Sequence, residues 1–275
     1  MTTNTNSLPL TDWLKKSTTK LNSAGISTAR LDCLVILEDV ISKDRSWLLA
    51  HPDLELSKNV VSKLSKQVKR RANHEPLAYI RGKREFYGRE FLVNRHTLEP
   101  RSETETMIDM TKQLSLPVKP RIADVGAGSG AIGITLALEL KGASVDMYEI
   151  SKPAIKVAQN NILKLKPPKC YIYNNTLLSK VKYSYDLVCA NLPYVPDSHT
   201  VNKAAMQEPK IAIFGGIDGL KLYKELFEQL KDLKPRYVLT ESLPFQHTSL
   251  AVIANNAGYR LSKTDDFVQQ FVLVK

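Results

Sequence analysis

After Pro120 the chain alternates short apolar runs with stretches of helical periodicity. RIADVGAG, SVDMYEI and YDLVCANLPY have the length of strands, while AIGITLALEL and GLKLYKELFEQL carry apolar residues at helical spacing. Apolar runs that alternate with helices in this way are typically buried in a parallel sheet that has helices on both faces. The last two runs, YRLSK and FVLVK, are close enough in the chain to pair as an antiparallel hairpin at one edge. The pattern therefore predicts an open α/β sheet.

Ligands of such a sheet bind beyond the carboxyl ends of its strands. The first strand ends in a glycine-rich loop, whose missing side chains let the backbone approach a ligand closely. Glu149 ends the next strand about 20 residues later, where a carboxylate can accept both hydroxyl hydrogens of a ribose. The candidates for holding a nucleoside-bearing cofactor are Asp124, Gly126, Ala127, Gly128, Ser129, Gly130 and Glu149. Taken alone, the loop also fits an NAD-dependent oxidoreductase or a purely structural turn.

A third strand ends in Asn191-Leu192-Pro193-Tyr194. This motif indicates which nucleoside-bearing cofactor the glycine loop binds. It resembles the Asn-Pro-Pro-Tyr motif of amino methyltransferases that use S-adenosyl-L-methionine, with Leu192 in place of the first proline. The side-chain carbonyl of Asn191 and the backbone carbonyl of Leu192 can each accept a hydrogen from a planar NH2 group, and Tyr194 can stack on that group. Positioning then carries most of the catalysis, and neither a strong general base nor a metal is expected.

The match to one family runs almost from end to end. STARLDCLVILEDVI, HEPLAYIRGKREFYGREFLVN, LEPRSETE and EPKIAIFGGIDGLKLYKEL resemble segments of the HemK/PrmC family, the protein glutamine-N5 methyltransferases that modify the Gly-Gly-Gln motif of class I peptide release factors. The resemblance implies a class I S-adenosylmethionine-dependent methyltransferase fold, Rossmann-like, with a seven-stranded mostly parallel sheet. It also implies an N-terminal helical substrate-recognition domain (residues 1–84), a linking β-hairpin (85–101) and a methyltransferase domain (102–275).

The resemblance implies roles for further residues. Thr176 and Leu177 occupy the stretch near the adenine of the cofactor, where the family usually has an acidic residue at the position of Thr176. Arg101 and Glu103 match a segment beside the active site and would position the loop of the substrate that carries the glutamine. An interdomain salt-bridge cluster is the alternative for these two. The Asn-Leu-Pro-Tyr loop would hold the glutamine amide itself, and Asn191 would also contact the cofactor.

Residues 27–85 show apolar residues at helical spacing, which predicts a small helical domain. The apolar positions are Leu34, Leu37 and Ile41, then Val61, Leu64 and Val68. One of these helices gathers the basic residues Lys58, Lys63, Lys66, Lys69, Arg70 and Arg71. They form either a face that grips an acidic partner or a solvated outer face. The stretch EFYGREFLVNRHTLEPR that follows predicts two short strands joined at Gly88.

The formal net charge of +11 favours nucleic acid or a ribonucleoprotein as a partner, or serves only solubility. Because no targeting segment or membrane span occurs, we expect a cytoplasmic protein, and the histidines and cysteines show no metal-ligand spacing. Nothing in the sequence suggests an obligate oligomer, so we expect a monomer. The family resemblance implies a class I release factor as its partner. No stable nucleic-acid binding is expected. Two alternatives stay open: a related amino methyltransferase acting on a ribosomal-protein glutamine or a nucleic-acid adenine, and a catalytically degenerate scaffold that binds a release factor or the ribosome.

Overall fold

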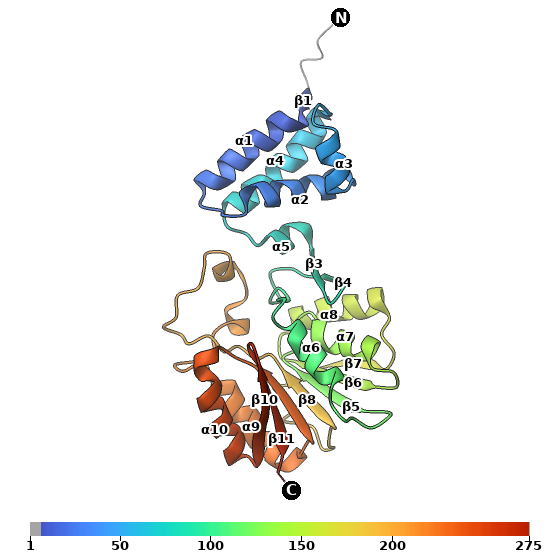
Figure 1. Ribbon diagram of the computed structural model, residues 1–275, viewed down its shortest axis with the longest axis vertical. Coiled ribbons are helices and arrows are strands. Elements are labelled where there is room, and N and C mark those ends of the chain that lie inside the picture. The colour runs from blue at the N-terminus through green and yellow to red at the C-terminus, as the bar shows by residue number, and fades with distance from the viewer. Residues whose placement is uncertain (1–6, 275) are drawn as a thin grey trace, which may run out of the picture. The chain divides into compact units, whose positions relative to one another are not determined.

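The computed structural model describes residues 7–274 (Figure 1). Contacts divide the chain into two units: one runs up to Gly82 and includes Asn202–Gln207, and the other comprises Lys83–Val201 and Glu208 onward. The β-hairpin at residues 83–92 belongs to the second unit by this division. The residue limits of the substrate-recognition domain stay a prediction.

The first unit is a helical bundle with a two-stranded antiparallel sheet. Its helices are α1 (Leu10–Ser23), α2 (Ala29–Ile41), α3 (Arg45–Ala50), α4 (Lys58–Ala72) and α5 (Leu77–Arg81), its strands are β1 (Ser7–Pro9) and β2 (Glu55–Ser57), and its 3-10 turn is η1 (Ala205–Gln207). Helices α2 and α4 confirm the helices predicted from apolar spacing. Leu34 and Leu37 of α2 and Leu64 and Val68 of α4 are buried in one core, because each pair lies on one side of its helix.

A buried ion pair joins two helices of this unit. The Arg71 Nε of α4 lies 2.6 Å from Asp32 Oδ2 of α2, and their side chains are only 12% and 5% exposed. Arg70 pairs instead with Glu75, 2.5 Å away. Two of the six basic residues that the sequence assigned to one face therefore have acidic partners, and Arg71 points into the bundle.

Asp32→Ala should lower the free energy of unfolding of this unit by about 3 kcal/mol, because it leaves a buried guanidinium without its counter-charge. Both tryptophans, Trp13 and Trp47, lie in the first unit, so tryptophan fluorescence during urea unfolding reports on it. Glu38→Ala breaks the exposed pair with Arg45 and should cost less than about 1 kcal/mol. Equal losses in the two variants would contradict this expectation.

The second unit is built on a seven-stranded sheet in the order β10-β11-β9-β8-β5-β6-β7. Its strands are β5 (Arg121–Val125), β6 (Ser144–Glu149), β7 (Cys170–Asn174), β8 (Leu187–Ala190), β9 (Tyr237–Glu241), β10 (Tyr259–Asp265) and β11 (Val268–Leu273). Strands β5 to β9 are parallel, whereas β11 runs antiparallel to both β9 and β10. The predicted sheet and its edge hairpin are confirmed. Strand β7 was not predicted, because CYIYN alternates exposed tyrosines with apolar residues instead of forming an apolar run.

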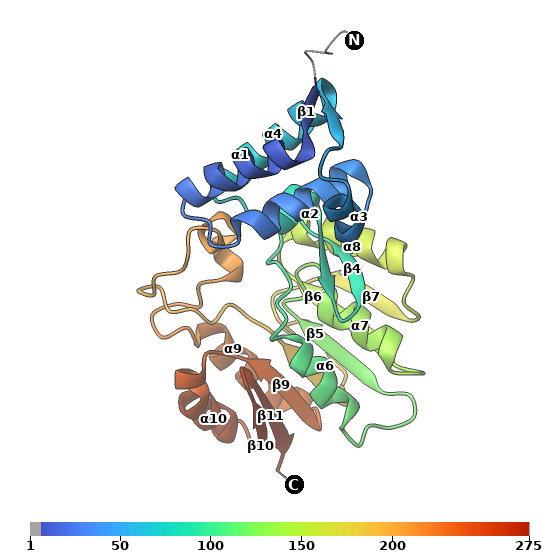
Figure 2. The ribbon, with the colours of Figure 1, turned by 45° about the horizontal axis from the view of Figure 1, so that its top comes forward.

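Helices cover the sheet in two layers (Figure 2). Helices α6 (Glu105–Lys112), α7 (Ala131–Glu139) and α8 (Lys152–Leu165) pack into one core cluster, and α9 (Lys221–Leu233) and α10 (His247–Asn256) pack into the other. Two short 3-10 turns, η2 (Lys210–Ala212) and η3 (Pro244–Gln246), complete the unit. This arrangement leaves the carboxyl ends of β5, β6, β7 and β8 at one edge, where ligands of such sheets bind.

The predicted hairpin is formed by β3 (Lys83–Phe86) and β4 (Arg89–Leu92). Tyr87 and Gly88 join them with positive φ angles of 50° and 69°, which suits a tight hairpin turn. Asn161 of α8 then ties the hairpin to the glycine loop, because its side chain bonds both the N–H and the carbonyl of Leu92 and also the carbonyl of Ser129.

No helix within residues 7–274 is long and apolar enough to cross a membrane. No cluster of three or more His, Cys, Asp and Glu side chains in this part of the chain could hold a metal ion.

Candidate active site

A pocket in the second unit lies where β5, β6, β7 and β8 end. Eleven of the residues predicted from the sequence line it: Arg101, Gly126, Ala127, Gly128, Ser129, Glu149, Thr176, Leu177, Asn191, Leu192 and Pro193. Four do not line it, namely Glu103, Asp124, Gly130 and Tyr194. The structure thus gathers the three strand ends singled out in the sequence into one cavity.

The three glycines of the loop are required at their positions for different structural reasons. Gly126, Gly128 and Gly130 all have positive φ angles, of 78°, 55° and 81°. A Cβ at Gly126 would lie 2.9 Å from Leu192 Cδ2, and one at Gly130 would lie 2.9 Å from Ile134 Cδ1. Nothing lies within 4 Å of the corresponding position at Gly128. Packing therefore requires glycine at the two ends, whereas the middle glycine leaves open space beside the backbone.

Glu149 braces this loop. Its Oε2 accepts a hydrogen bond from the Gly128 N–H at 2.9 Å and its Oε1 accepts one from the Ser151 N–H at 2.8 Å. A carboxylate oxygen can accept more than one hydrogen bond, so both oxygens keep capacity for a further donor in the pocket. The side chain is suitably placed to accept a pair of hydroxyl groups.

Asp124 lies beneath the loop and is fully buried. Its Oδ2 accepts the Gly133 N–H at 2.8 Å, which fixes the first turn of α7 against β5, while its Oδ1 has no hydrogen-bond partner among the described residues. Burial raises the pKa of the Asp124 carboxyl to about 7; the Gly133 N–H opposes this rise and the charge of Glu149 adds to it. Asp124 therefore supports the loop instead of facing the pocket.

Asp124 should make the fold less stable as the pH rises. The folded chain keeps the proton on this carboxyl up to a pKa of about 7, whereas the unfolded chain loses it near the ordinary value of 3.8. The folded state therefore binds more protons between these values, and stability falls as the pH rises through them. We expect this group to lower the free energy of unfolding by about 2 kcal/mol between about pH 5.5 and pH 8.

Urea unfolding followed by circular dichroism across this pH range checks the expectation. Asp124→Asn should remove that part of the decline, because an amide does not titrate. Asp53→Asn, a change at an exposed aspartate, should retain it. An unchanged decline in the Asp124 variant would show that another group is responsible.

The loop after β8 presents two acceptor oxygens. Asn191 Nδ2 donates to Thr104 Oγ1 at 3.2 Å, which orients the amide. The Leu192 N–H donates to the Tyr223 hydroxyl at 3.1 Å, and that hydroxyl donates to the Glu241 carbonyl at 2.5 Å. Asn191 Oδ1 and the Leu192 carbonyl accept no hydrogen bond from the described part of the chain. Both oxygens therefore remain able to bind an NH2 group.

Tyr194 is held away from the pocket wall. Its hydroxyl donates to Glu241 Oε1 at 2.9 Å, and its carbonyl accepts from Gln246 Nε2 at 2.8 Å. Burial raises the pKa of the Tyr194 hydroxyl, and the charge of Glu241 raises it further. The stacking expected of Tyr194 stays a prediction.

Glu241 is a buried carboxyl that the sequence analysis did not assign to the site. It is 1% exposed, and its Oε2 has no hydrogen-bond partner among residues 7–274. Burial raises its pKa, an effect that the neighbouring Thr104, Tyr194 and Asn191 side chains partly oppose. Glu241 ends β9 at the same sheet edge as Glu149, so the rule that selected Glu149 could have found it. Thr104 gives no comparable signal, because only the fold brings it to Asn191.

The Asn-Leu-Pro-Tyr loop after β8, which lacks the first proline of the family motif, is restrained by the neighbouring backbone. A Cβ at Gly215 would lie 2.2 Å from the Pro193 carbonyl oxygen, and one at Gly219 would lie 2.0 Å from the Tyr194 carbonyl oxygen. Leu192 is buried and its N–H is hydrogen-bonded, which a proline could not reproduce. Tertiary contacts therefore supply part of the rigidity that a proline would provide.

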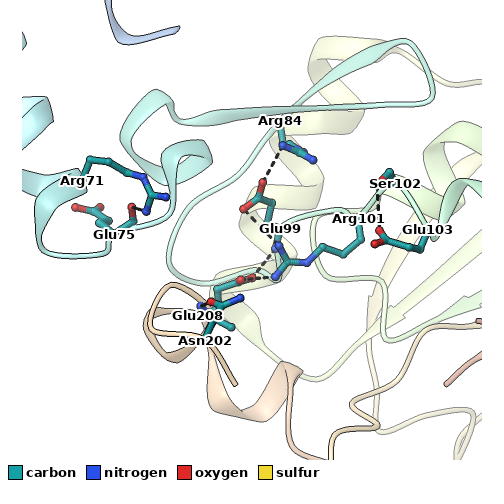
Figure 3. A network of polar contacts seen from close by, with 10 residues as sticks. Arg71, Glu75, Arg84, Glu99, Arg101, Ser102, Glu103, Asn202 and Glu208 are labelled. Carbon is teal, nitrogen blue, oxygen red and sulfur yellow. Dashed lines mark hydrogen bonds and ion pairs between the residues drawn. The ribbon is translucent and has the colours of Figure 1, made fainter. Parts of the chain in front are cut away.

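Arg101 belongs to a network of charged side chains (Figure 3). Its guanidinium pairs with Glu208 and lies 3.7 Å from Glu99 Oε2, and Arg84 lies 3.1 Å from Glu99 Oε1. Glu208 also accepts the Glu99 N–H at 2.9 Å. Burial raises the pKa of Glu208, and Arg101 opposes this rise. The network holds the segment around Arg101 against the loop that carries Glu208. Glu103 is not part of this network, and its side chain accepts a hydrogen bond from the Ser102 hydroxyl.

Two parts of the chain match known protein families, and its second unit has structural relatives. Residues 12–82 match the PrmC N-terminal domain and residues 104–208 match the methyltransferase small domain. The structure resembles a ribosomal protein L11 methylase from Lactobacillus delbrueckii subsp. bulgaricus (16% identity, TM-score 0.50, 66% of this chain and 84% of that one). It also resembles a methyltransferase from Pyrococcus furiosus (16% identity, TM-score 0.50, 68% and 89%). At this identity the two structures establish a shared fold.

Proteins found by sequence similarity are more nearly identical to this chain than the two solved structures are. A bifunctional methyltransferase of Rickettsia bellii is 35% identical over 251 residues, 80% of this chain and 45% of that protein, so the chain spans about half the length of such relatives. The release factor glutamine methyltransferases of Coxiella burnetii (32% identity, 85% of this chain and 86% of that protein) and Koribacter versatilis (34%, 78% and 79%) match over most of both lengths. On these matches the chain belongs to the HemK/PrmC family of release factor glutamine methyltransferases.

Proposed function

We propose that this chain transfers a methyl group from S-adenosyl-L-methionine to the side-chain amide nitrogen of the glutamine in the Gly-Gly-Gln motif of peptide chain release factors. The observation that carries the proposal is a pair of acceptor oxygens, Asn191 Oδ1 and the Leu192 carbonyl, which accept no hydrogen bond from residues 7–274 and lie in a pocket that also contains the glycine loop. The names of the relatives that match over most of their length support the same substrate.

The residues of the pocket fit the cofactor. Gly128 leaves open space beside the backbone, so the methionine portion can lie along the loop. Glu149 would accept the ribose hydroxyls, and Leu177 with Ile150 offers apolar surface for the adenine. When bound, S-adenosyl-L-methionine supplies an electrophilic methyl group on a sulfonium.

The protein's own part in the reaction is to position the amide. Asn191 Oδ1 and the Leu192 carbonyl each accept one hydrogen of the glutamine NH2 group, which aims its nitrogen and stabilises the positive charge that grows on it. Thr104 holds Asn191 in the required rotamer, and Tyr223 holds the backbone of Leu192. Arg101, anchored by Glu208 and Glu99, positions the loop of the substrate.

We also propose a cytoplasmic location and a monomeric state for this protein. The cysteines Cys33, Cys170 and Cys189 are buried and form no disulfide, which fits a reducing compartment such as the cytoplasm. We propose a monomer whose N-terminal domain, expected at residues 1–84, contributes to recognition of the release factor.

The test is incubation of the protein with radiolabelled S-adenosyl-L-methionine and a purified class I release factor. A release factor whose Gly-Gly-Gln glutamine is changed to alanine serves as the control. Label on the first protein only is the expected result. Label on neither, with cofactor binding retained in calorimetry, would overturn the substrate, and absence of cofactor binding would indicate a degenerate scaffold.

A further inference from the structure

Strand β7 carries two exposed tyrosines on one face of the sheet. Tyr171 and Tyr173 are 51% and 43% exposed, and they lie opposite Asp146 and Tyr148 of β6. Residues two apart in a strand face the same side and are roughly 6.6 Å apart. Helices α7 and α8 cover the opposite face, where Ile172 joins their core, and residues 175–186 connect β7 to β8 without a helix. The two rings are therefore left as an open platform.

The ring of Tyr173 is held in place by its neighbours. Tyr173 stacks on Tyr148 with ring centroids 5.6 Å apart and an interplanar angle of 28°. The Tyr148 hydroxyl lies 2.6 Å from that of Tyr185, which donates to Asp146 Oδ2 at 2.9 Å. One side of the Tyr173 ring is thus fixed by buried neighbours, and binding on its other side needs little further ordering.

The surroundings of the platform are basic. Residues 167–185, which comprise β7 and the segments on either side of it, contain three lysines and no aspartate or glutamate. Lys169 directly precedes β7, and Lys180 and Lys182 lie in the loop that follows it; all three are exposed and none makes an ion pair with a described residue. The Arg121 guanidinium lies 3.6 Å from the centre of the partly exposed Tyr183 ring beside the platform. Two nearby acids are engaged by Arg121: Asp146 is buried and pairs with its guanidinium, and Asp186 Oδ2 accepts its backbone N–H at 2.8 Å.

We propose that Tyr171 and Tyr173, with Lys169, Lys180 and Lys182, form a binding surface for single-stranded RNA. Exposed aromatic rings bordered by cations bind single strands, because each base stacks on a ring while the cations neutralise the phosphates. The tyrosine hydroxyls can bond the 2′-hydroxyl of a ribose, which favours RNA over DNA. This surface would add to the methyl-transfer function and differs from the expectation of no stable nucleic-acid binding.

The test measures fluorescence anisotropy of a labelled 12-nucleotide oligouridine with the full chain. Tyr171→Thr and Tyr173→Thr retain strand propensity but lack the ring, and each should weaken binding about tenfold. Changing Lys169, Lys180 and Lys182 together to alanine should reduce the salt dependence of binding by about two units of log K against log salt. Changing Tyr171 and Tyr173 together to phenylalanine should retain stacking and lose the preference for RNA over the matching DNA.

The matched control changes Lys58, Lys63 and Lys66 of α4 to alanine, which removes the same charge from another exposed surface. Its binding should stay within about twofold of the unchanged protein, because these lysines belong to α4 of the first unit and not to the proposed surface. Equal weakening by both lysine triples would show binding by net charge alone and overturn the site. Equal binding of the matching DNA would overturn the choice of RNA, and absence of oligouridine binding at low salt would overturn the proposal as a whole.

Discussion

Replacing Asn191 by alanine is expected to lower the turnover number of methyl transfer about a thousandfold, as loss of a preorganised polar group at a reacting centre does in other enzymes. The variant removes one of the two acceptors that orient the target nitrogen and leaves the Leu192 carbonyl as the other. Thr104 then loses the Asn191 partner that it holds at 3.2 Å. Cofactor affinity should change little, because the glycine loop and Glu149 are untouched.

Initial rates of label transfer to the release factor and calorimetry with S-adenosyl-L-methionine measure the two effects separately. Asn255→Ala, a change at an exposed asparagine of α10, is the matched control and should leave both unchanged. A rate within about tenfold of the unchanged protein would contradict the role of Asn191, since even one positioned polar group is worth more than that.

Glu149→Ala is expected to weaken the binding of S-adenosyl-L-methionine at least about 300-fold. The variant loses the acceptor for the ribose hydroxyls and also the two bonds that brace the backbone at Gly128 and Ser151. Glu149→Gln retains one acceptor oxygen and should show a smaller loss, because its amide donates where an acceptor is needed.

Calorimetric titration with the cofactor measures this affinity. Glu90→Ala serves as the control, because Glu90 is an exposed glutamate of the hairpin whose partners are Lys83 and Lys164. Unchanged affinity in Glu149→Ala would show that the cofactor does not bind at the end of β6, and the proposed site would then be wrong.

The sheet could be predicted wherever a strand is buried on both sides. Such strands read as apolar runs, as β5 and β8 do. Strand β7 could not be predicted, because its exposed tyrosines leave no such run and the strand is recognisable only beside β6. Arg71 was placed on a basic face for the related reason that its acidic partner, Asp32, lies 39 residues away in the sequence.

Some residues of the site could also be predicted from the sequence, and others could not. The glycine loop, Glu149 and Asn191 each follow an apolar run directly, so position in the sequence identified them. Thr104, Tyr223 and Glu208 reach the site from other segments, through contacts with Asn191, Leu192 and Arg101. Local patterns carry no information on such contacts, because they depend on how distant elements pack.

The sequence alone determined the kind of fold and the family, since burial leaves a periodic trace in the chain and motifs are continuous in it. Only the tertiary structure decided what each residue does at its position. It turned Asp124 beneath the loop and anchored Tyr194 to Glu241. It also left Asn191 Oδ1 and the Leu192 carbonyl without a hydrogen-bond donor among the residues that the structure describes. Hydrogen-bond partners and burial arise from packing between segments far apart in the chain, and the pKa of Asp124 near 7 arises from that packing as well.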